Sequence, residues 1–164
     1  MSETELLVRQ LDAQRRHILS AVAGLTDEQM HQAVLPSGWS LLELFSHLTI
    51  GDEHYWFECV VKGSGPFADL PRGPRADWLI DPAEPADMII KRYQVQIERS
   101  NAIIAAAGLD APPAQPDPTW GDWGAQLSDV RSVILHVITE TAVHAGHVDA
   151  VCELLDGRQW IVMD

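Results

Sequence analysis

The sequence lacks several features, and each absence excludes a class of protein. The chain of 164 residues contains no run of about 18 apolar residues, so no transmembrane span is predicted. Its first residues, Met1-Ser2-Glu3-Thr4-Glu5, are acidic and lack the basic and apolar segments of a secretory signal. We therefore expect a cytoplasmic protein that does not bind membranes.

Positive charge and cysteine are also scarce. Eleven Lys and Arg residues stand against 24 Asp and Glu residues, which gives a net charge of −13. A surface with this charge repels phosphate backbones, so nucleic-acid binding is not expected. The two cysteines, Cys59 and Cys152, fall inside predicted helices and are expected to be reduced packing residues. A redox or ligand role for Cys59 is the alternative.

The common catalytic motifs are missing as well. The sequence has no Gly-x-Ser-x-Gly, no Walker A loop, no dinucleotide fingerprint and no Cys-x-x-Cys pair. No segment alternates convincingly between apolar and polar residues, so strands are not predicted. What remains is helical, and hydrophobic residues make up 46% of the chain, enough for a sizeable core.

Helix signals are strong along the whole chain. Ser2-x-x-Glu5, Thr26-x-x-Gln29 and Ser40-x-x-Glu43 are capping boxes, each followed by helical apolar spacing. We predict long helices over about 2–24, 40–62, 85–108 and 128–157, a short helix from 26 to about 34, and long loops over 63–84 and 109–127. The fold class is therefore all-α: a single domain, 1–164, forming a four-helix bundle with long crossover loops and one short extra helix.

Two polar residues interrupt the apolar stripe of the last helix. Glu140 and His144 are four residues apart, so they face the same side of the helix and one ion can contact both. A buried carboxylate is costly unless it is paired or binds a metal. His47, at the edge of the buried face of the second long helix, is the best third ligand. Two imidazoles and a carboxylate suit Zn²⁺ or Fe²⁺, and Ni²⁺ or Mn²⁺ remain open.

Other interpretations of these residues stay open. Glu140 could instead pair with an arginine, and His144 could be an ordinary core histidine; the arginines considered are Arg92, Arg99 and Arg131. His136 could be a fourth ligand, a partner that orients Glu140, or a surface residue. His147 could replace His144 in the site or lie at the helix flank.

The sequence gives weaker indications of a general base and a pocket rim. His54, Glu53 and His136 are the candidates for a general base, and spacing singles out none of them. Six tryptophans are many for this length. They form an aromatic pocket rim or a dimer contact, or they anchor loops; the rim candidates are Trp39, Trp56, Trp120 and Trp123.

Several segments together resemble a known family. They are Gly38-Trp39-Ser40-Leu41-Leu42 leading to His47, then Glu53 and Tyr55-Trp56-Phe57, and finally the run from His136 to Asp149. The chain resembles the DinB-like superfamily over nearly its whole length. It is most similar to a small actinobacterial branch related to the mycothiol-dependent enzymes.

The resemblance implies a site and a range of functions. It implies a homodimeric four-helix bundle that holds one divalent metal ion through His47, Glu140 and His144. Much of the superfamily has histidine where this chain has Glu140, and a carboxylate there is similar to the thiol-dependent isomerase branch. The implied function is an S-transferase or isomerase that uses a low-molecular-weight thiol such as mycothiol and a small-molecule substrate. The alternatives are a metal-dependent hydrolase, or a non-enzymatic dimeric bundle that binds a small molecule or a partner protein.

Overall fold

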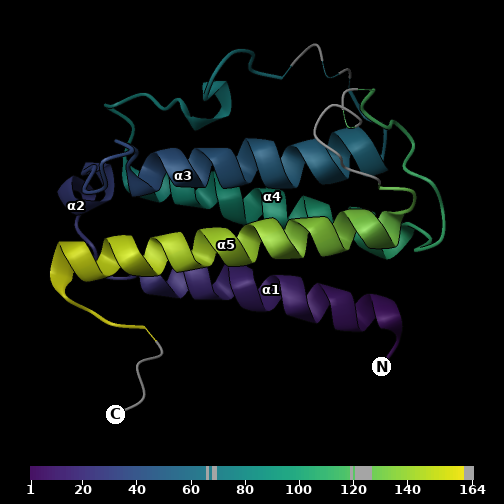
Figure 1. Ribbon diagram of the computed structural model, residues 1–164, viewed down its shortest axis with the longest axis horizontal. Helices are drawn as coiled ribbons and strands as arrows, with labels where there is room; N and C mark the ends of the chain where they lie inside the picture. The colour runs from purple at the N-terminus through teal and green to yellow at the C-terminus, as the bar shows by residue number, and fades with distance from the viewer. Residues whose placement is uncertain (66, 68–69, 119, 121–126, 161–164) are drawn as a thin grey trace.

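Four long helical rods pack side by side in the computed structural model, which describes residues 1–65, 67, 70–118, 120 and 127–160 (Figure 1). The rods are α1 (Glu3–Ala21), α3 (Leu41–His47) continued by η1 (Leu48–Val61), α4 (Ala86–Ala106) and α5 (Val130–Asp156). Two short helices, α2 (Asp27–His31) and η3 (Ala76–Trp78), lie in the connections. The described residues contain no strand, and the predicted all-α fold is confirmed. None of the described helices is long and apolar enough to cross a bilayer.

Side-chain caps fix most helix starts where the sequence predicted them. Ser2, Thr26 and Ser40 each accept a hydrogen bond from the backbone N–H three residues on, and each capping box is complete. The last helix differs from the prediction. Asp129, one residue after the predicted start at Ser128, caps α5, because its carboxylate accepts from the N–H of Ser132.

The second rod changes its winding in the middle. From Leu48 to Val61 it is a π-helix, in which each N–H reaches a carbonyl five residues back; the bond from Lys62 N to Phe57 O is 3.0 Å. A π-helical stretch of this length is rare, and π-turns are frequent at functional sites. The apolar spacing predicted a helix here but not the wider turn. The consequence is that residues five apart share a face of η1.

The direction of the helices explains the first long loop. In Figure 1, the α3–η1 rod and α4 run the same way, so the connection between them must return along the bundle. This crossover, residues 62–85, carries η3 past α3, and these two elements are in contact. The residues of η3, which are far from α3 in the sequence, are thereby placed against the end of that helix.

A buried ion pair joins α1 to η1 inside the core. Nε and Nη2 of Arg15 donate to the two carboxylate oxygens of Glu53 at 2.7 and 2.6 Å. The two side chains are only 2% and 1% exposed. Nη1 of Arg15 also donates to Asp12 and Asn101, so the guanidinium is well satisfied.

Candidate functional site

His47 is held in place by the crossover connection. It is the last residue of α3, and its Nδ1 donates to Asp77 Oδ2 at 2.5 Å. The indole of Trp78 stacks on the imidazole, with centroids 4.6 Å apart and planes at 17°. Both partners belong to η3. A carboxylate on Nδ1 fixes the ring orientation and leaves Nε2 free to face inward.

Gly51 makes room for this pair. A Cβ atom at position 51 would lie 2.6 Å from Asp77 Oδ2 and 2.8 Å from His47 Nδ1. Any other side chain would therefore displace one of the two partners. The glycine inside a helix, normally a cost of about 1 kcal/mol relative to alanine, has a local steric reason here.

His144 meets His47 across the bundle. It comes from the buried face of α5, and the two Nε2 atoms are 3.2 Å apart. Burial lowers the pKa of His144 to about 4, and the neighbouring His47 and His147 add to the effect. His144 is therefore neutral at pH 7, with a lone pair on Nε2.

The pKa of His47 moves in the other direction. Burial acts to lower it, but the hydrogen bond to Asp77 and the negative charges of Asp52, Asp77 and Glu140 outweigh burial and raise it. Of the two imidazoles, His47 is thus the one that binds a proton more readily, and its Nε2 lies within hydrogen-bonding distance of His144 Nε2.

Asp52 is the carboxylate closest to the two imidazoles. Its Oδ1 is 3.9 Å from Nε2 of His47, and its side chain is 5% exposed. Oδ2 is buried and has no hydrogen-bond partner among the described residues. Burial raises the pKa of Asp52 to about 7; His47 opposes the rise, while Glu53, Glu140 and Asp77 add to it.

Asp52 could not be predicted as a partner of His47 from α-helical spacing. Residues five apart on an α-helix point about 140° away from each other. The π-turn of η1 brings position 52 back beneath position 47. Only a sign of π-helical winding could have revealed Asp52 from sequence, and the apolar pattern of residues 48–61 carries none.

These residues fit a divalent cation. His47, Asp52 and His144 each offer one ligand atom, and the three atoms lie within 4.8 Å of one another. Two nitrogens that bind one ion at about 2.1 Å lie roughly 3.0–3.4 Å apart in octahedral or tetrahedral geometry. The Nε2–Nε2 separation of 3.2 Å falls in this range. Asp52 adds a carboxyl group to the cluster, and its Oδ2 is buried without a hydrogen-bond partner among the described residues.

Glu140 lies beside this group but not inside it. It is half-buried, and Thr141 rather than Glu140 continues the buried stripe of α5. Its charge acts on both His47 and Asp52, which places it near the site. The three arginines considered as partners pair elsewhere: Arg131 with Glu3 and Asp110, Arg92 with Glu84, and Arg99 with Glu58. Glu140 is therefore a second carboxylate at the edge of the cluster.

The other candidate histidines have different surroundings. His147 is exposed, and its ring lies 5.7 Å from that of His144. His136 packs edge-on against Trp56 at 4.5 Å, and burial lowers its pKa. His54 turns toward Glu58, at 3.5 Å, and toward Cys59 Sγ, at 3.7 Å.

Of the acidic and aromatic candidates, some lie beside the site and others lie elsewhere. Both oxygens of Glu53 are bound by Arg15, as described above. Trp39 lies 5.9 Å from Trp78 and 6.2 Å from His147, which places it beside the site. Trp56 and Trp120 stack at 5.6 Å in the core, and Trp123 lies outside the described residues.

Comparison with known proteins finds one family model that matches most of the chain. A family model described as mycothiol-S-transferase matches residues 6–157, a range that includes every residue of the cluster. No curated protein and no solved structure matches the chain at a significant level.

Proposed function

The chain belongs to the mycothiol-S-transferase family, which is DinB-like, and we propose that it joins a low-molecular-weight thiol of the mycothiol type to an electrophilic small molecule. The observation that supports a chemical role is the pair of facing Nε2 atoms of His47 and His144, 3.2 Å apart beside the buried Asp52. Burying such a cluster costs free energy unless a ligand pairs with its polar atoms. Groups of this kind gather at functional sites.

The residues at the centre would hold a divalent metal ion. His47 and His144 would bind through Nε2, and a carboxylate oxygen would come from Asp52 or Glu140. When bound, the ion lowers the pKa of a thiol beside it and so provides a thiolate at neutral pH. Asp77 keeps the His47 ring oriented, and Trp78 covers one face of that ring, which limits access of water.

The proposed reaction is a nucleophilic substitution at carbon, in which every proton and electron pair is accounted for. The thiol proton passes to a carboxylate of the site, Asp52 or Glu140, whichever does not hold the cation. The sulfur lone pair forms the new C–S bond with the electrophilic carbon. The leaving group departs with the electron pair of the bond that breaks, as halide does from an alkyl halide.

The rings around the cluster favour an apolar electrophile. Trp39, Trp78 and His147 lie next to one another on the side of the site formed by α5 and the crossover. Aromatic faces stabilise apolar and unsaturated ligands and exclude water from them.

The test combines metal content with thioether formation. Protein purified without an affinity tag is analysed for Zn, Fe, Ni and Mn, and is then assayed with mycothiol and a fluorogenic alkyl halide. We expect about one equivalent of metal and saturable thioether formation. His144→Ala should lose the metal and at least about 100-fold in rate, because removing even a residue that only orients a ligand costs about 10- to 100-fold.

His31→Ala is the matched control, because His31 lies on α2 and pairs with Asp27 away from the cluster. It should keep both the metal and the rate. Metal bound without any thioether formation would contradict the transferase proposal. Hydrolysis of ester substrates by that metal-loaded protein would identify a hydrolase instead.

A further inference from the structure

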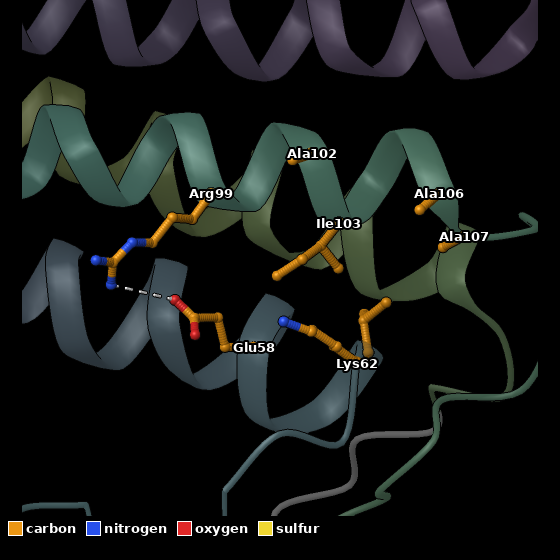
Figure 2. Close-up of a pocket in the computed structure, with 8 residues that line it drawn as sticks. Glu58, Lys62, Arg99, Ala102, Ile103, Ala106 and Ala107 are labelled. Atoms are coloured by element: carbon orange, nitrogen blue, oxygen red, sulfur yellow. Dashed lines mark ion pairs between the residues drawn. The ribbon is translucent and has the colours of Figure 1, made fainter.

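A cavity lies between η1 and α4, away from the His47–Asp52–His144 cluster (Figure 2). Its volume is about 600 Å³, within the range of small-molecule sites. None of the residues that line it belongs to the His47–Asp52–His144 cluster. It is therefore separate from the site described above.

The walls of this cavity are apolar and built from small residues. Helix α4 contributes Ala102, Ile103 and Ala106, its C-cap residue is Ala107, and η1 contributes Val61. Three alanines within six residues leave the space that larger side chains would fill. An apolar chain laid along them would lose water contact, the main source of affinity for such a ligand.

The polar groups at the cavity carry an excess positive charge. Glu58 is already engaged: Gln96 Nε2 donates to its Oε1 at 2.9 Å, and Arg99 lies 3.8 Å from the same oxygen. The ammonium group of Lys62 forms no hydrogen bond or ion pair within the described part of the chain. In the view of Figure 2 the Lys62 side chain points toward Glu58, which lies between its amine and the Arg99 guanidinium.

We propose that this cavity binds an amphipathic monocarboxylate, with its carboxylate at Lys62 and Arg99 and its apolar chain along the alanines of α4. The ends of η1 and α4 carry partial negative charge, but this effect falls off within the last turn. Arg99 lies two turns before the end of α4, so the carboxylate avoids the negative end of that helix. Lys62 is the C-cap residue of η1, and its ammonium offsets the negative end there. This site does not depend on the proposed transferase function.

The test is an NMR titration of the full chain with octanoate, monitored through backbone amide shifts. Octanoate has ten heavy atoms, and a ligand of this size should bind with a Kd of roughly 0.2–5 mM. We expect saturable shifts at Ala102, Ala106 and Lys62, and weaker binding of octan-1-ol. Lys62→Gln should weaken octanoate binding about threefold to fivefold, the effect of one exposed ion pair. Ala106→Leu should abolish binding by filling the cavity.

The chain offers a matched control for each variant. Lys91, the other of the two lysines, and Ala105 are exposed on α4 outside the cavity, so Lys91→Gln and Ala105→Leu should bind octanoate as wild type does. Thermal melts would confirm that all four variants fold. The proposal is overturned by an absence of saturable shifts, by shifts centred on His144, by equal binding of octan-1-ol, or by equal losses in Lys62→Gln and Lys91→Gln.

Discussion

Replacing Gly51 with alanine should separate the stability of the bundle from the integrity of its site. The added methyl group would lie 2.6 Å from Asp77 Oδ2 and 2.8 Å from His47 Nδ1. Both atoms belong to side chains that can rotate away, so the helix is expected to stay intact. The bond between Asp77 and His47, 2.5 Å in the native protein, is what must break.

The magnitudes follow from two opposing contributions. Alanine is favoured over glycine inside a helix by about 1 kcal/mol. Loss of a hydrogen bond to a charged group costs about 1.5–3 kcal/mol. Gly51→Ala should therefore lower the free energy of unfolding by about 0.5–2 kcal/mol. The His47 ring loses its orientation at the same time, and the affinity for Zn²⁺ should fall about 10- to 100-fold.

Gly146→Ala is the matched control, because Gly146 is a helical glycine with no atom within 4 Å of the added Cβ. It should raise the free energy of unfolding by up to about 1 kcal/mol and leave Zn²⁺ binding unchanged. Urea unfolding and chelator competition measure the two quantities. If Gly51→Ala matches Gly146→Ala in both, then the contact among Gly51, His47 and Asp77 does not orient the site.

Three further predictions concern the acidic residues. The folded-state pKa of Asp52 is raised from 3.8 to about 7, so the folded metal-free protein holds a proton there that the unfolded chain has lost, and stability falls as pH rises between these values. Asp52→Asn should remove this slope, stabilising the metal-free protein at pH 8 but not at pH 3.5 in thermal melts; an unchanged slope would contradict the assignment. The same variant should weaken metal binding more than Glu140→Gln does in elemental analysis, since Asp52 lies within the 4.8 Å cluster, and the opposite order would make Glu140 the ligand. Glu53→Gln should cost about 3–5 kcal/mol in urea unfolding, because Arg15 loses its fully buried counter-ion and keeps only the partly exposed Asp12. The exposed Glu98→Gln should change stability by no more than about 0.5 kcal/mol, and equal effects of the two variants would mean that the buried pair is not coupled to folding.

Local signals in the sequence determined where the first helices of this chain begin and which residues form them. The caps at Ser2, Thr26 and Ser40 depend on a side chain and a backbone group three residues away, so they are readable without a fold. The apolar stripes are local in the same sense. Because the stripes pointed His47 and His144 toward one core, their pairing across the bundle could be anticipated. The metal that they are proposed to hold remains a prediction.

Only the tertiary structure decided how the site is completed. Asp52 shares a face with His47 because η1 winds as a π-helix, and no local preference in the sequence announces that winding. Asp77 and Trp78 reach His47 because the crossover must return along the bundle between parallel helices. Glu53 has both oxygens bound by Arg15, from a helix 38 residues earlier in the chain. The contacts of His47 with η3 and of Glu53 with Arg15 join residues far apart in sequence, and their energies exist only once the helices have packed.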